Sequence, residues 1–215
     1  EIVQIIQEFS TAGGAERVAW ELAQSMERAG IPNSVIASAF APACGRSTAV
    51  RPVARWLSRM PTRGFLRYIG RLLVVPIFTL SATSVARSRR DAVLISHGDS
   101  FVGDILVVHA VNAENLAEKR RAGSWLWLLN PMHFWVSVRD RFMIGGLRYK
   151  RYVAVSPRVK HELEKNYKVP PDRIVVISNG VDVERFKLDP QARNVTRRAF
   201  GIPPDGKLLT FVGHE

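Results

Sequence analysis

The sequence of 215 residues contains a single cysteine, Cys44. One cysteine excludes an internal disulfide and a zinc site built from several thiolates, and it is typical of a reducing compartment. No residue near Cys44 in the sequence would activate its thiol, which favours a packing role. The histidines show neither HxH nor HxxxH spacing. The sequence therefore does not favour a zinc site.

The sequence also lacks an apolar run long enough to span a bilayer. The run over residues 72–86 contains Pro76, and the run over 122–138 is interrupted by Asn130, Pro131 and His133. The second run carries three of the five tryptophans, Trp125, Trp127 and Trp135. This density suits a membrane interface or a lipid-tail groove, and it suits a buried core helix equally well. The sequence opens in a strand-like run without a signal peptide, so we expect a cytoplasmic piece of a longer protein.

Acidic residues are absent between Arg28 and Arg90, a segment that holds eleven arginines and carries most of the net charge of +12. Six of these arginines, from Arg51 to Arg71, recur at every fourth position between aromatic and aliphatic residues. On helices broken near Pro61 and Gly64, this pattern predicts a basic stripe beside an apolar one. The segment 51–73 therefore favours contact with an anionic membrane surface, although a solvated basic face over ordinary core is an alternative.

Strand-like and helix-like segments alternate along the chain. We predict strands at residues 2–9, 34–40, 92–96, 105–110, 152–155, 174–177 and 208–212. We predict helices at 15–29, 113–121, 131–142, 157–167 and 191–200, with one or more across 53–85. Ser156 and Asp189, each followed by proline, are expected to cap helices. Such alternation predicts an α/β fold with a doubly wound parallel sheet, Rossmann-like, whose ligands bind beyond the carboxyl ends of the strands.

The first strand and the first helix are joined through two adjacent glycines, Gly13 and Gly14. Glycine lets the backbone approach a ligand, and the free N–H groups of a helix start attract a phosphate or carboxylate. Glu16 lies in the first helical turn, where the helix dipole favours an acid. The segment matches neither the GxGxxG fingerprint nor a P-loop. A plain glycine turn is the alternative.

Polar residues follow several other predicted strands, and parallel strands end at the same edge of a sheet. These residues are His97, Gly98, Asp99, His109, Asn112, Ser156, Asn179 and Gly180. We expect them to form one rim with the glycine turn. Structural roles for both histidines and a turn cap at Asp99 are the alternatives. A serine hydrolase is poorly supported, because no GxSxG motif is present.

Several of these motifs together resemble glycosyltransferase family 4. They are GGAERV at 13–18, the strand-end His109, YVAVSPRVKHEL at 152–163, PPDRIVVISNGVDVERF at 170–186 and GIPPDGKLLTFVG at 201–213. Members of this family are retaining, nucleotide-sugar-dependent enzymes with two Rossmann-like domains in a B-type arrangement. The resemblance implies an N-terminal acceptor-binding domain over 1–178, an interdomain connection over 179–206 and the first strand of a donor-binding domain over 207–215.

The resemblance also implies roles for particular residues. Gly13 and Gly14 would approach the phosphates and sugar of the donor, and His109 would be the catalytic residue that reaches the transferred sugar near its anomeric centre. Glu16, His97, Asp99 and Asn112 are the candidate acceptor-binding residues. The sequence has His214 where family members often have an arginine after FVG, and a Glu-x7-Glu motif would lie beyond Glu215.

The implied reaction is a metal-independent transfer of a sugar, with retention, from a nucleotide-diphospho-sugar to a hydroxyl acceptor, without any further cofactor. The implied partners are the nucleotide sugar, a lipid-linked or saccharide acceptor and an anionic cytoplasmic leaflet, as in polysaccharide, lipopolysaccharide or glycolipid synthesis. A non-catalytic sugar- or nucleotide-binding module is one alternative. A nucleic-acid binder that uses the same arginines is another, but no recognisable RNA- or DNA-binding motif accompanies them.

Overall fold

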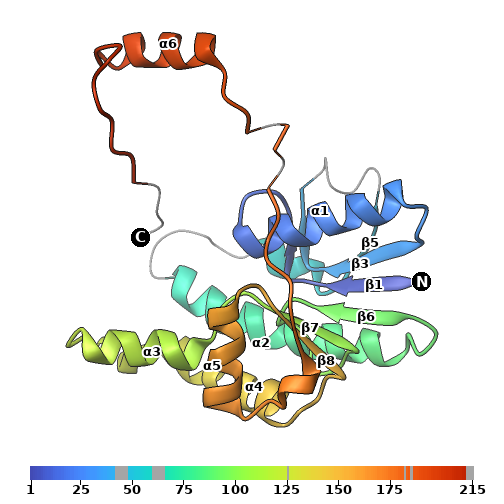
Figure 1. Ribbon diagram of the computed structural model, residues 1–215. Coiled ribbons are helices and arrows are strands. Elements are labelled where there is room, and N and C mark those ends of the chain that lie inside the picture. The colour runs from blue at the N-terminus through green and yellow to red at the C-terminus, as the bar shows by residue number, and fades with distance from the viewer. Residues whose placement is uncertain (42–47, 60–65, 125, 182, 185, 212–215) are drawn as a thin grey trace. The chain divides into compact units, whose positions relative to one another are not determined.

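The computed structural model describes residues 1–211 except 42–47, 60–65, 125, 182 and 185; the side chains at 58, 59, 66–69, 71, 126 and 129 also lie outside the described part (Figure 1). The chain divides into two compact units, Glu1–Asn179 and Gly180–Glu215. The candidate site residues of the glycine turn and of the strand ends up to Asn179 all belong to the first unit.

The first unit is built on a seven-stranded sheet in the order β5-β3-β1-β6-β7-β8-β9, and each neighbouring pair is parallel. Its strands are β1 (Ile2–Ile5), β3 (Asn33–Ala37), β5 (Ala49–Pro52), β6 (Val93–Ser96), β7 (Ile105–Val108), β8 (Arg151–Ala154) and β9 (Ile174–Val176). The chain runs outward from β1 through β3 to β5, then returns to β6 on the other side of β1. The predicted doubly wound sheet is confirmed, with its switch point between β1 and β6.

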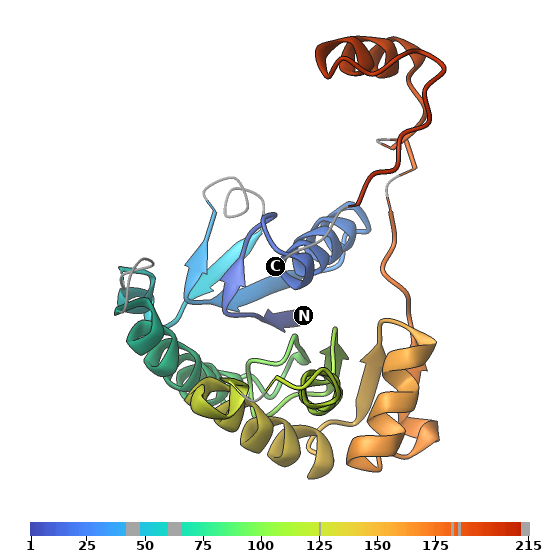
Figure 2. The same ribbon diagram turned by 90° about the vertical axis from the view of Figure 1, so that its left-hand side faces the viewer.

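Helices cover both faces of this sheet (Figure 2). The helix α2 (Leu66–Arg87) packs through Phe78 and Ala82 against Val3 and Ile5 of β1. Successive residues of a strand point to opposite faces, so Gln4 between them faces the helix α1 (Gly14–Arg28). The alternating side chains of β1 thus contact α2 on one face of the sheet and α1 on the other.

The other elements complete the two units. They are β2 (Glu8–Phe9), β4 (Ala39–Phe40), η1 (Arg55–Arg59), α3 (Asn112–Arg121), η2 (Leu126–Leu129), α4 (Pro131–Asp140), the π-helical turn η3 (Arg141–Gly145), α5 (Pro157–Tyr167), η4 (Pro171–Arg173) and, in the second unit, α6 (Pro190–Ala199). Both predicted caps are confirmed. Ser156 Oγ accepts the N–H of Val159 at 3.2 Å, and an Asp189 carboxylate oxygen accepts the N–H groups of Gln191 and Ala192.

Two expectations about secondary structure are wrong. Arg51 lies in β5 rather than on a helix, because residues 49–52 form an exposed edge strand that ends at Pro52, where the missing N–H costs little. The strand expected at 208–212 is not formed over residues 208–211. A strand is stabilised by hydrogen bonds to a neighbour, and the described residues of the second unit offer it no ladder partner. The expected helix break near Pro61 and Gly64, the side chains of Arg59, Arg63, Arg67 and Arg71, and also Cys44, Trp125 and His214 lie outside the described part.

Candidate functional site

Two histidines meet at the carboxyl edge of the sheet, beside the switch point. His97 is the first residue after β6, and His109 is the first after the neighbouring strand β7. Their rings are stacked, with centroids 5.6 Å apart and planes inclined by 17°. The Nδ1 atom of His97 lies 3.3 Å from the Nε2 atom of His109. The sequence placed both residues on one rim, and the structure brings them into hydrogen-bonding contact.

Gln4 extends this contact into the core. Its Oε1 atom lies 3.0 Å from Nε2 of His97, and its Nε2 atom donates to the carbonyl oxygen of Ala19 in α1 at 3.1 Å. The side chain of Gln4 is completely buried. Sequence reasoning did not identify Gln4 as a site residue, although a signal existed. It is the single polar residue in the apolar run of residues 2–6.

Both histidines are neutral at neutral pH. Burial lowers the pKa of His97 to about 3, and repulsion from His109 lowers it further when that ring is protonated. Burial also lowers the pKa of His109. An imidazole that stays neutral has one N–H and one lone pair, so it can orient a hydroxyl group by donating or accepting a hydrogen bond.

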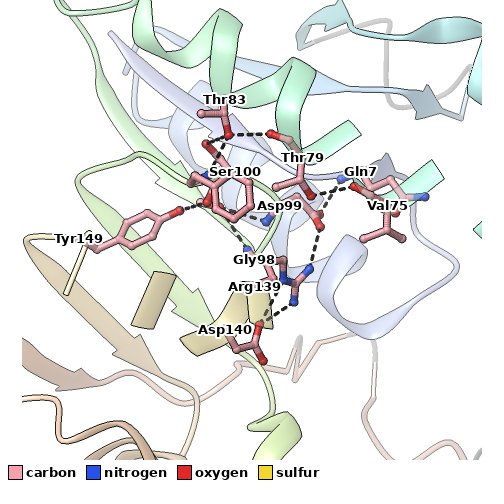
Figure 3. Close-up of polar contacts among 12 residues, drawn as sticks. Gln7, Val75, Thr79, Thr83, Gly98, Asp99, Ser100, Arg139, Asp140 and Tyr149 are labelled. Atoms are coloured by element: carbon pink, nitrogen blue, oxygen red, sulfur yellow. Dashed lines mark hydrogen bonds and ion pairs between the residues drawn. The ribbon is translucent and has the colours of Figure 1, made fainter. Parts of the chain in front are cut away.

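Asp99 is held by two different segments (Figure 3). Its Oδ2 atom accepts the N–H of Gln7 at 2.9 Å, and its Oδ1 atom lies 3.8 Å from an Nη atom of Arg139 on α4. Burial raises the pKa of Asp99, the Arg139 charge and the Gln7 N–H oppose this shift, and the Glu16 carboxylate adds to it. Arg139, which also pairs with Asp140 at 3.0 Å, was not singled out from the sequence.

The loop that carries His97 and Asp99 is supported from behind by buried hydroxyl groups. The Thr83 hydroxyl accepts the N–H of Phe101 at 2.8 Å and lies 3.4 Å from the Ser100 hydroxyl. The Tyr149 hydroxyl donates to the carbonyl of Ser100 (Figure 3). These contacts attach the loop to α2 and to the segment before β8.

The glycine turn forms the start of α1. Gly13 is the N-cap of α1. The first N–H groups of a helix have no intrahelical partner, and no side chain caps them here. The Glu16 side chain folds back over Gly13, whereas no atom lies within 4 Å of the position that a β-carbon on Gly14 would occupy. The segment that leads from β1 into this turn contacts the loop that follows β6, because the N–H of Gln7 donates to Asp99 at 2.9 Å.

Asn112 and Ser156 make contacts with neighbouring helices. Asn112 donates to Ser137 Oγ of α4 at 3.0 Å, which ties the start of α3 to α4. The Ser156 hydroxyl is engaged as the cap of α5. The contacts described for these two residues therefore support the rim rather than join them to the histidine pair. No group of three or more metal-ligating side chains occurs among the described residues.

A model of glycosyltransferase family 4 matches residues 12–185, which is most of the chain and includes the glycine turn and both histidines. The chain belongs to glycosyltransferase family 4. Among its relatives, a D-inositol 3-phosphate glycosyltransferase of Thermobispora bispora is 38% identical over 63 residues, which are 29% of this chain and 14% of the relative. Another protein of that name, from Saccharomonospora viridis, is 40% identical over 52 residues, which are 24% and 12% of the two chains.

Two solved glycosyltransferase structures share the fold of this family 4 chain. The structure of WaaG, a glycosyltransferase involved in lipopolysaccharide biosynthesis, superposes with a TM-score of 0.69 and 14% identity, covering 95% of this chain and 52% of that one. A glycosyltransferase from Rickettsia africae ESF-5 gives a TM-score of 0.53 at 18% identity, covering 95% and 50%. The chain thus spans about half the length of these two proteins. Within the described part of the family 4 chain, none of the helices has the length and apolar character that a membrane span requires.

Proposed function

We propose that the intact protein transfers a sugar from a nucleotide-diphospho-sugar to an acceptor hydroxyl with retention. The observation that carries this proposal is the neutral His109 beside the switch point of the sheet, on the same edge as the uncapped start of α1. Ligands of doubly wound sheets bind at this position. Membership of family 4 supports sugar transfer as the reaction.

In the proposed reaction, the bond between the anomeric carbon and the diphosphate oxygen breaks, and a bond to the acceptor oxygen forms on the same face. The proton of the acceptor hydroxyl passes to the departing diphosphate. The N–H groups at the start of α1 favour an anion, so they are suited to the donor's diphosphate without a metal ion. His109 holds the transferred sugar, and basic groups of a second domain complete the stabilisation of the diphosphate. Closure of the two domains excludes water.

Glu16 is the best-supported acceptor-binding residue. Among the described residues its carboxylate has no hydrogen-bond partner, so it is available to accept from a sugar hydroxyl. Asp99 and His97 already have protein partners on the atoms described above, and Asn112 is engaged with Ser137. We therefore propose that Glu16 contacts the acceptor and that the other three residues shape the wall of the acceptor site.

We also propose that the protein acts at an anionic membrane surface on the cytoplasmic side, where a lipid-linked or lipopolysaccharide-type acceptor is within reach. In the arginine-rich segment 51–73, Arg55 and Trp56 of η1 are exposed. The structure adds an exposed apolar stripe along α4 and η3 at helical spacing, with Phe134, Val138 and Phe142 exposed by 74%, 48% and 45%. Exposed apolar side chains and exposed basic side chains are both features of surfaces that lie on anionic lipid.

The test of the reaction uses the intact enzyme with a panel of UDP-, GDP- and ADP-sugars and sugar or lipid-linked acceptors. We expect a product whose anomeric configuration, measured by NMR, is that of the donor. His109→Ala should lower turnover at least about tenfold with the fold retained, since a positioned catalytic group contributes at least that much. His161→Ala is the matched control, because His161 is exposed on α5. Inverted product would contradict retention, and unchanged turnover in His109→Ala would remove His109 from the site.

A further inference from the structure

Ala19, Gln4, His97 and His109 are linked by a chain of hydrogen bonds, and the donor and acceptor of each bond can be assigned. A backbone carbonyl can only accept, so the Gln4 atom 3.1 Å from Ala19 O is the amide nitrogen. The amide oxygen of Gln4 consequently faces His97 Nε2 at 3.0 Å. Because an amide oxygen only accepts, His97 carries its proton on Nε2.

The same reasoning assigns the donor in the hydrogen bond between His97 and His109. His97 stays neutral because it is buried, so a proton on Nε2 leaves Nδ1 with a lone pair. That lone pair lies 3.3 Å from Nε2 of His109 and accepts its proton. His109 is then the Nε2–H tautomer, and its Nδ1 atom has no partner among the described residues.

We infer that Gln4 and His97 are positioning residues that fix His109 in its Nε2–H tautomer and leave Nδ1 as the acceptor nitrogen for a hydroxyl of the transferred sugar. This inference rests on the proposed function, because it takes His109 as the residue that contacts the sugar. The two strands β1 and β6 hold the chain of hydrogen bonds in place through their parallel register, in which Gln4 pairs with Ile95 two residues before His97. His109 therefore acts through a lone pair rather than through an N–H group.

A fixed tautomer matters because a histidine free in solution exchanges its proton between the two ring nitrogens. If Nδ1 of His109 carried the proton for part of the time, the sugar hydroxyl would have to accept rather than donate the hydrogen bond, and its orientation would change. Ionisation of His97 would reverse the hydrogen bond between the two histidines, since His97 would then donate from Nδ1 as well as from Nε2. Among the charged and titratable groups nearby, a protonated His109 would repel a charge on His97, Asp99 is paired with Arg139 and accepts from Gln7, and the Glu16 charge raises the pKa of Asp99.

The experiment reads the ring nitrogens of the intact, ¹⁵N-histidine-labelled protein by NMR at neutral pH without substrate. We expect pyrrole-type Nε2 and pyridine-type Nδ1 signals for both His97 and His109. The assignment uses His97→Gln and His109→Ala spectra. A pyrrole-type Nδ1 on His109 in the wild-type protein would overturn the inference, whatever the turnover of any variant. Since this spectrum needs no substrate, it is independent of the His109→Ala turnover that tests the proposed function.

Gln4→Met removes the acceptor for His97 while keeping the length of the side chain. We expect His109 to become a mixture of tautomers and kcat to fall about fivefold, the value of one neutral hydrogen bond, with the donor KM changed less than about twofold. The matched control is Thr79→Val, which removes another completely buried polar group, a hydroxyl that donates within α2 at 2.8 Å. Thr79→Val should leave both the His109 signals and kcat unchanged. A Gln4→Met protein with the wild-type His109 signals would show that Gln4 does not fix the tautomer of His109.

Discussion

Glu16 folds back over Gly13, so that a β-carbon added at Gly13 would lie 2.0 Å from Oε2 and 2.6 Å from Cδ of Glu16. At the adjacent Gly14, a β-carbon would meet no atom within 4 Å. The two glycines of the turn therefore differ. Gly13 accommodates a side chain of the protein itself, and Gly14 borders space that a ligand can enter.

We expect Gly14→Ala to fold normally and to gain about 0.5 kcal/mol of stability, because alanine restricts the unfolded chain and meets no clash in the folded one. If the donor approaches the turn at Gly14, its KM should rise about tenfold, corresponding to about 1.4 kcal/mol. Donor titration of the intact enzyme and thermal unfolding measure the two effects. Gly13→Ala is the comparison, since it displaces the flexible Glu16 side chain and should weaken acceptor binding first. An unchanged donor KM in Gly14→Ala would exclude this turn from the donor site.

The buried His97 should make the folded protein sensitive to acid. Its pKa is about 3 in the folded state against 6.5 for an ordinary histidine. Below pH 6.5, His97 binds a proton in the unfolded chain but stays neutral in the folded protein. The stability due to His97 is therefore complete above that pH and is lost as the pH falls toward 3. Between about pH 7.5 and about pH 5 the loss should be about 2 kcal/mol from His97 alone, and His109 adds to it in the same direction.

Urea unfolding of the wild type and of His97→Asn at both pH values checks this expectation. The variant should lose less stability on acidification, even if its stability at the higher pH is lower. Replacing the exposed His161 by alanine should leave the slope unchanged. An equal slope in the wild type and His97→Asn would show that His97 is not held neutral by burial.

The basic segment and the apolar stripe should both contribute to binding of anionic vesicles. Replacing Arg55, Arg59, Arg63 and Arg67 by glutamine should abolish sedimentation with anionic liposomes, since each arginine near such a surface contributes about 1 kcal/mol. Replacing Phe134, Val138 and Phe142 by serine should weaken vesicle binding but leave the salt dependence of that binding unchanged. Neutral vesicles should bind much less. Undiminished binding of the arginine variant, or equal competition by short duplex DNA, would contradict the membrane proposal.

The cap of α5 should be worth a measurable part of the stability. Ser156 Oγ accepts the N–H of Val159, which otherwise has no intrahelical partner, so Ser156→Ala should cost about 1 kcal/mol. Urea unfolding of the intact protein measures this cost. Ser84→Ala is the matched control, because Ser84 is an exposed residue of α2 and its replacement should change stability by less than about 0.5 kcal/mol. Equal effects of the two substitutions would mean that the cap contributes nothing.

Much of the fold was predictable because its signals are local. Apolar runs such as residues 2–6 and 105–108 indicate buried parallel strands, and Ser156 and Asp189 mark helix starts through capping chemistry that involves only the next three residues. The edge strand β5 was not predicted, because an exposed edge strand has no run of buried apolar residues. Its residues Arg51 and Pro52 are exposed. The strand predicted at 208–212 failed over 208–211 for the opposite reason: its sequence suits a strand, but the described residues of the second unit offer it no partner strand.

The sequence was enough to identify the residues that end the strands, and it placed His97, Asp99 and His109 on one rim. It also carried the motifs of glycosyltransferase family 4. The partners of these residues could not be predicted: His97 joins His109 to the buried Gln4, and Arg139 of α4 reaches Asp99. These partners lie 12, 93 and 40 positions apart in the chain, and the parallel order of β1, β6 and β7 brings the first two pairs together. A hydrogen bond depends on distance in space rather than along the chain, and strand order and helix docking set that distance.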